Sequence, residues 1–244
     1  MELDGHRYTA LSPRPSVTCK FATNRYHETW HVLTDADGAA LLGRLFWAMS
    51  YQRRERTIIV IDAPLLVPNP FDADPSSPIV IVNNDLGALP RAAVADLRSR
   101  IPLKIPSEGT VVLQTRGLDL ALADEAAFRR REEHAGWQWN AHQQRRWIDR
   151  VNGTLVIAAP PPVLRAWGVR MSLPERWIYP DAEYLDWPDV TGEVQILDDL
   201  EERVSRASAA RELLFPGRGH RELGEAERRQ VWEAGTDEPS AGSE

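Results

Sequence analysis

The sequence predicts an α/β fold with a mixed β-sheet of about four to six strands and helices on both faces; α+β is the alternative. Residues 58–61, Ile-Ile-Val-Ile, form an unbroken β-branched apolar run, which is typical of a strand covered on both faces. Similar short runs recur at residues 79–82, 111–113 and 155–157. Stretches with apolar residues at helical spacing lie between the runs and predict the helices.

Three segments are expected along the chain. Residues 1–16 are interpreted as an irregular lead-in, residues 17–215 as a single α/β domain, and residues 216–244 as a charged, largely disordered tail. Within the domain, helices are predicted over residues 39–52, 118–128, 137–151 and 194–215, and from Pro90 onward. Further strands are predicted over residues 17–21, 26–34 and 109–115.

Composition narrows the class of protein. The net charge of -7 argues against a nucleic-acid-binding surface. Among 29 basic residues only Lys20 and Lys104 are lysines, a bias that indicates GC-rich coding and a bacterial source. The single cysteine, Cys19, excludes an intrachain disulfide and a thiolate metal cluster. No apolar run approaches membrane-spanning length and the first residues are polar, so we expect a cytoplasmic protein with no membrane partner.

The connection over residues 65–78 is unusual because it carries several prolines and no helical pattern. Consecutive parallel strands normally need a crossover helix. The strands at Ile58 and Ile79 are therefore expected to be antiparallel or not to be neighbours. The sequence alone does not establish whether they are parallel. Long loops of this kind are either functional or stiff surface connections, and the second interpretation is the more common.

The motif His27-Glu28-Thr29-Trp30-His31 matches H-E-x-x-H. Over these five residues the chain resembles zinc metalloproteases, in which a helix places both histidines on one metal and the glutamate activates its water. The surrounding residues favour a strand instead, and on a strand the two histidines lie about 13 Å apart. In a strand, Trp30 is expected to be buried, with His27 and His31 nearer solvent.

Polar side chains also end two of the predicted strands: Asp62 ends the first, and Asn83, Asn84 and Asp85 end the second. If the two strands are parallel, these groups converge at one sheet edge and form a binding site for a metal or for sugar hydroxyls. If the strands are antiparallel, the groups lie at opposite ends and cap local turns.

No P-loop, dinucleotide-binding fingerprint or nucleophile elbow is present. The leading hypothesis is therefore a non-catalytic interaction or binding protein of a bacterial cytoplasm. Its expected partner is a protein, and the hypothesis is also supported by the aromatic, proline-rich loops and the charged tail. The tryptophans at helical spacing among the nine are expected to pack in the core or at a helix interface. The alternative is a metal-dependent hydrolase in which His27 and His31 bind zinc and Glu28 acts as the base. No cofactor is predicted outside that alternative.

Overall fold

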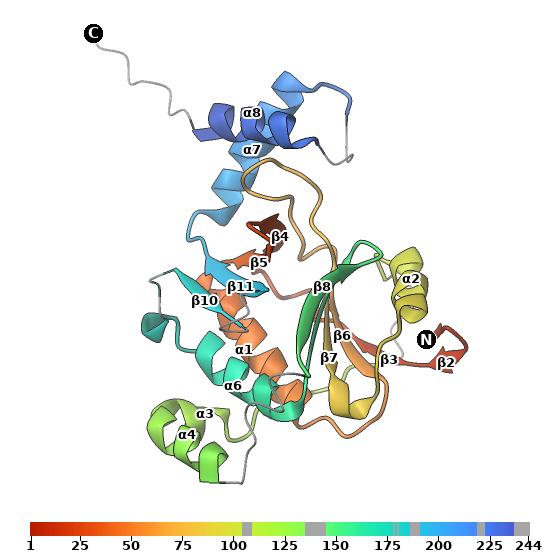
Figure 1. The fold of residues 1–244 in the computed structure, drawn as a ribbon, viewed down its shortest axis with the longest axis vertical. Coiled ribbons are helices and arrows are strands. Elements are labelled where there is room, and N and C mark those ends of the chain that lie inside the picture. Colours follow the sequence, from red (N-terminus) through yellow and green to blue (C-terminus); the bar gives the residue numbers. More distant parts are fainter. Residues whose placement is uncertain are drawn as a thin grey trace.

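The computed structural model describes residues 1–103, 109–134, 145–177, 179, 181–185, 191–218 and 223–236 of the chain. It has an α/β fold with mixed sheets and helices, as predicted (Figure 1). Among the described residues, no helix combines the length and the apolar character that crossing a bilayer would need.

The larger sheet has five strands in the order β3-β6-β7-β9-β8. These are β3 (Thr9–Leu11), β6 (Thr57–Ile61), β7 (Ile79–Asn83), β9 (Thr154–Ala159) and β8 (Trp147–Val151). The pairs β3/β6 and β7/β9 are parallel, whereas β6/β7 and β8/β9 are antiparallel. Every residue of β6, β7 and β9 is buried, as the unbroken apolar runs predict.

Helices cover both faces of this sheet (Figure 1). Ile59 and Ile61 of β6 belong to the core formed with α1 (Ala36–Ser50) and α6 (Pro161–Met171). Ile58 and Val60, which point the other way, belong to a second core with α2 (Arg91–Arg100).

A smaller sheet, which the sequence did not predict, has the order β10-β11-β5-β4. Its strands are β10 (Ala182–Tyr184), β11 (Gly192–Ile196), β5 (Thr29–Thr34) and β4 (Phe21–Tyr26). One face contributes Val32 and Val194 to the core of α1 and α6. The opposite face packs Ala22 and Leu33 against Leu200 at the start of α7 (Leu200–Leu214).

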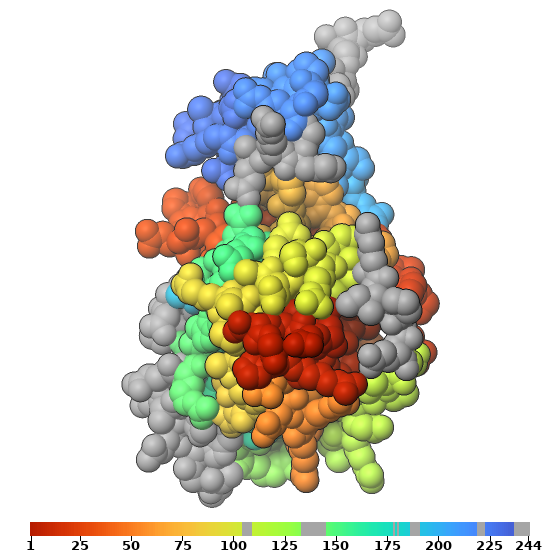
Figure 2. Space-filling view, turned by 90° about the vertical axis from the view of Figure 1, so that its right-hand side faces the viewer, coloured from red at the N-terminus to blue at the C-terminus, as the bar shows by residue number. Residues whose placement is uncertain are grey.

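The C-terminal residues add a helix where a disordered tail was expected. Helix α8 (Glu225–Thr236) packs along α7, and Val231 is fully buried between them. Ala73, in the proline-rich connection, belongs to the same apolar cluster. Figures 1 and 2 show this connection lying against the two helices. Residues 237–244 lie outside the described part of the chain.

The N-terminal residues are also more ordered than an irregular lead-in. Strands β1 (Glu2–Leu3) and β2 (His6–Arg7) pair with each other, and β3 joins the larger sheet. Leu3 and Tyr8 are buried in the core that includes residues of α2, so these residues complete one face of the sheet. Figure 2 shows the N-terminal segment, in dark red, at the surface of the molecule.

Four predicted elements were wrong in type or extent. Residues 109–115 form no strand, and Val111 and Val112 are exposed, so this segment has no buried face to favour pairing. Residues 147–151 form strand β8 and not a helix; residues 137–144 of that prediction lie outside the described residues. Residues 192–196 form β11 ahead of α7, and the strand expected over residues 17–21 begins only at Phe21. The helical prediction for residues 118–128 is confirmed by α3 (Leu118–Ala123) and α4 (Glu125–His134).

Candidate functional site

The H-E-x-x-H motif lies on a β-hairpin. His27 and Glu28 form the two-residue turn between β4 and β5, with φ of 46° and 69°, the left-handed values that tight hairpin turns require. His31 lies within β5. The extended conformation predicted for this segment is confirmed, although the turn divides it into two strands. The motif therefore lacks the helix on which its metal-binding geometry depends.

His31 is buried, and the expectation that it lies near solvent was wrong because β5 is an inner strand between β4 and β11. Its Nε2 lies 3.7 Å from Oε2 of Glu193. Burial, with a smaller contribution from the charge of His27, lowers the pKa of His31 to about 4, and burial raises the pKa of Glu193. Within the described residues, no three His, Cys, Asp or Glu side chains come together to hold a metal ion.

The structure does not bring Asp62 together with the other strand-end residues, Asn83, Asn84 and Asp85. Because β6 and β7 are antiparallel, Asp62 and Asn83 lie at opposite ends of the sheet. The Asp62 carboxylate accepts a hydrogen bond from the backbone of Leu103 at 2.8 Å. Asn83 accepts from the backbone of Asp85 at 3.0 Å and donates to the carbonyl of Met49 at 3.1 Å.

The remaining two strand-end residues bind Arg145. Asn84 donates to its carbonyl, and Asp85 pairs with its guanidinium, both at 2.6 Å. Of the four, only Asn83 makes the local turn-capping contact expected, with the backbone of Asp85, whereas Asp62, Asn84 and Asp85 contact residues distant in the sequence.

The proline-rich loop (residues 65–78) lies along the outer edge of β4. Phe21 donates to the carbonyl of Leu65 and accepts from the backbone of Val67, and the backbone of Thr23 donates to Oγ of Ser76. The loop thereby covers the edge that β4 would otherwise expose.

A polar pocket of about 470 Å³ opens beside this loop. The loop, the β4–β5 hairpin, strand β8 and helix α8 together supply its walls. The lining residues are Thr23, Asn24, Arg25, Trp30, Asn69, Asp72, Asp74, Pro75, Ser77, Asp149, Arg150 and Arg228.

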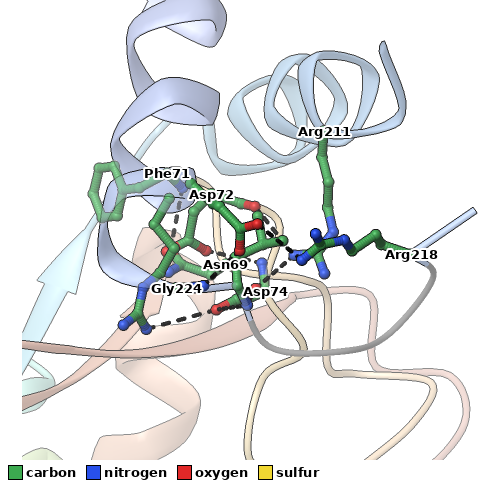
Figure 3. Close-up of polar contacts among 10 residues, drawn as sticks. Asn69, Phe71, Asp72, Asp74, Arg211, Arg218 and Gly224 are labelled. Atoms are coloured by element: carbon green, nitrogen blue, oxygen red, sulfur yellow. Dashed lines mark hydrogen bonds and ion pairs between the residues drawn. The ribbon is translucent and has the colours of Figure 1, made fainter. Parts of the chain in front are cut away.

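Hydrogen bonds within the loop fix its shape at the pocket (Figure 3). Oδ1 of Asn69 accepts from the backbone of Phe71 at 3.1 Å, and Oδ1 of Asp72 accepts from the backbone of Asp74 at 2.8 Å. The backbones of Asn69 and Asp74 are bonded at 2.9 Å, and Ala73 between them has a left-handed φ of 56°. These side-chain-to-backbone bonds are Asx turns, which hold a loop without regular secondary structure.

Asp74 anchors the loop to the C-terminal helices (Figure 3). Arg211 of α7 donates to its Oδ1 at 2.5 Å, and the backbone of Leu223 donates to the same oxygen at 3.0 Å. Arg228 of α8 lies 3.6 Å from its Oδ2. Both carboxylate oxygens of Asp74 are therefore engaged, and the buried pair with Arg211 ties α7 to the loop.

Three polar atoms of the loop have no such partner. Nδ2 of Asn69, Oδ2 of Asp72 and Oγ of Ser77 make no hydrogen bond to the described residues, although the three residues are only 3%, 7% and 5% exposed. None of these atoms is sealed from solvent, and all three residues line the pocket. Burial raises the pKa of Asp72 to about 6. The hydrogen bond from the backbone of Asp74 and the charges of Arg228 and Arg211 lower this pKa, but their effect is smaller than that of burial.

Sequence reasoning had named the loop but none of its pocket residues. The signal was the alternation of Asn69, Asp72, Asp74 and Ser77 with prolines, which a surface turn explains equally well. Comparisons of the chain with protein-family models, curated proteins and solved structures gave no match.

Proposed function

We propose that the chain is a non-catalytic binding protein and that the polar pocket is its ligand site. The observation that carries the proposal is the set of polar atoms on the buried residues Asn69, Asp72 and Ser77 that have no partner among the described residues and open on the pocket. Polar atoms of buried residues almost always have a partner in the protein or in ordered water, and for these three the partner can only come from within the pocket. Three such atoms opening on one cavity are typical of a site whose partner is a ligand.

The dimensions and chemistry of the pocket support this proposal. Its volume of about 470 Å³ lies within the range of about 300–1,000 Å³ that small-molecule sites occupy. Among the described residues that line the pocket there is no histidine, cysteine or lysine, so Ser77 and Thr23 have no histidine or lysine base beside them in this lining. These features favour binding over the alternative of a metal-dependent hydrolase.

The same proposal includes a protein partner, a cytoplasmic location and a bacterial source for the chain. Leu213 of α7 and Trp232 of α8 are 80% and 51% exposed, and apolar and aromatic side chains of this kind supply the contacts at protein interfaces, which supports a protein partner at these helices. Capture from extracts of the native cell with wild type and Trp232→Asp tests this part. A protein retained equally by both would contradict a contact at Trp232.

The pocket is tested by thermal unfolding in the presence of neutral sugars, amino acids, nucleosides, polyamines and inorganic phosphate, each supplied separately. We expect at least one class to raise the melting temperature of the wild type and to lose that effect with Asn69→Ala. Asn84→Ala, outside the pocket, is the matched control and should respond as the wild type does. Stabilisation by no class, or equal stabilisation of both variants, would contradict the proposal.

A further inference from the structure

The arginines and aspartates that line the pocket are equal in number, and each makes at least one contact within the protein. Three arginines, Arg25, Arg150 and Arg228, face three aspartates, Asp72, Asp74 and Asp149. Arg228 lies beside Asp74, the guanidinium of Arg25 lies 5.4 Å from the centre of the Trp30 ring, and Arg150 also has a partner. Among the described residues that line the pocket, arginines and aspartates balance in number, so the lining carries no excess positive charge that would favour an anionic ligand.

The open atoms have complementary hydrogen-bonding roles. Nδ2 of Asn69 can only donate, because Oδ1 of the same amide is fixed by the backbone of Phe71. Oδ2 of an ionised Asp72 can only accept, whereas Oγ of Ser77 does both. An anion would satisfy Asn69 but would be repelled by Asp72. A cation would satisfy Asp72 but would leave Asn69 without an acceptor. A hydroxyl group both donates and accepts, so neighbouring hydroxyls satisfy all three atoms without added charge.

The walls are joined to each other before any ligand enters. Nε1 of Trp30 donates to Oδ1 of Asp149 at 3.3 Å, which links β5 of the smaller sheet to β8 of the larger one. Across the pocket, Arg211 and Arg228 hold Asp74 and with it the loop. A preformed polar site loses little conformational entropy on binding, which favours a small ligand with few contacts.

From these contacts we infer that the pocket takes a neutral, polyhydroxylated small molecule, such as a sugar or a cyclic polyol. Neighbouring hydroxyls would bind Asn69, Asp72 and Ser77, with no group of the ligand carrying a full charge. The inference rests on the proposed function, because it names the chemistry of the ligand at that same site.

The test is calorimetric titration of the full chain with sets of sugars that share one ring and differ in charge at one substituent. Each set contains a neutral hexose, its 2-amino derivative and its uronic acid, and myo-inositol is added as a cyclic polyol. We expect a neutral compound to bind with one site per chain and more tightly than its charged counterparts. Loss of one polar contact should weaken binding about tenfold or more in Asn69→Ala, while Asn84→Ala binds as the wild type does.

The possible results distinguish a wrong ligand chemistry from a wrong assignment of the pocket as the ligand site. If only an amino sugar or only a uronic acid binds, and Asn69→Ala weakens that binding, the inference is overturned while the pocket remains the ligand site. If a neutral sugar binds Asn69→Ala as tightly as the wild type, both the inference and the proposed ligand site are overturned. The same holds if no compound of this panel or of the broader thermal panel binds the wild type.

Discussion

His31 shows how the position of one strand changes the chemistry of a residue. The side chain lies on an inner strand, and burial lowers its pKa from 6.5 to about 4. The folded protein therefore keeps His31 neutral over a range in which the unfolded chain takes up a proton. The stability that this group contributes is present above pH 6.5 and is lost as the pH falls toward 4.

Replacing His31 with glutamine removes this titration. Between pH 7 and pH 4.5 we expect the wild type to lose about 2–3 kcal/mol more unfolding free energy than His31→Gln does. Urea denaturation of both proteins at the two pH values measures the difference. His6→Gln, at an exposed histidine of β2, is the control and should change stability by no more than about 0.5 kcal/mol. An unchanged pH dependence in His31→Gln would show that His31 binds a proton equally well in the folded and unfolded states, which would contradict the lowered pKa.

At the scale of secondary-structure elements, the proline-rich loop depends on α7 and α8 for its position. Arg211 and Asp74 form a buried ion pair, and Ala73 between the aspartates packs into the cluster of the two helices. Breaking a buried pair leaves the remaining charge without compensation, which is more costly than losing a surface pair.

Arg211→Ala is therefore expected to lower the free energy of unfolding by about 3–5 kcal/mol. Arg206 on the same helix is the matched control, since it pairs with Asp199 and Glu202 at the surface and is 43% exposed. Arg206→Ala should cost at most about 1 kcal/mol. Chemical denaturation of the two variants compares them, and equal losses would contradict an anchoring role for Arg211.

Several elements could be predicted because their signals are local. Buried strands β6, β7 and β9 coincide with unbroken apolar runs, and α1 begins after Asp35, whose carboxylate accepts from the backbone of Gly38. Strand β8 was mistaken for a helix, although Asn152-Gly153 is a common turn of β-hairpins and both residues have positive φ. That turn predicts a strand on each side.

At the scale of the whole molecule, neither the strand order nor the pocket could be predicted from local sequence patterns. β4 and β5 are close in sequence, but β11 pairs with β5 across more than half of the chain. The pocket likewise combines residues 23–30, 69–77, 149–150 and 228. Such non-local contacts leave no periodic pattern in the sequence. The sequence therefore indicated the strand-end residues as candidate site residues and not the loop residues that line the pocket.

Oδ2 of Asp72 opens on the pocket without a partner, and we propose that its ionised carboxylate is kept there for a ligand at the expense of stability. Its pKa of about 6 lies above the ordinary 3.8, so the folded protein holds this proton more tightly than the unfolded chain does. Stability from this group is present at pH 3.8 and below, and it falls as the pH rises toward 6. This trend is opposite to that of His31, so the two partly cancel in the wild type.

Urea denaturation of Asp72→Asn at pH 7 is the most direct test. The asparagine keeps an Oδ1 acceptor for the backbone of Asp74 but has no charge to bury. We expect the variant to be more stable than the wild type by about 1–3 kcal/mol at pH 7, with a smaller gain at pH 4. A variant less stable than the wild type at pH 7 would show that the charge of Asp72 supports the fold, which would contradict its assignment to a ligand.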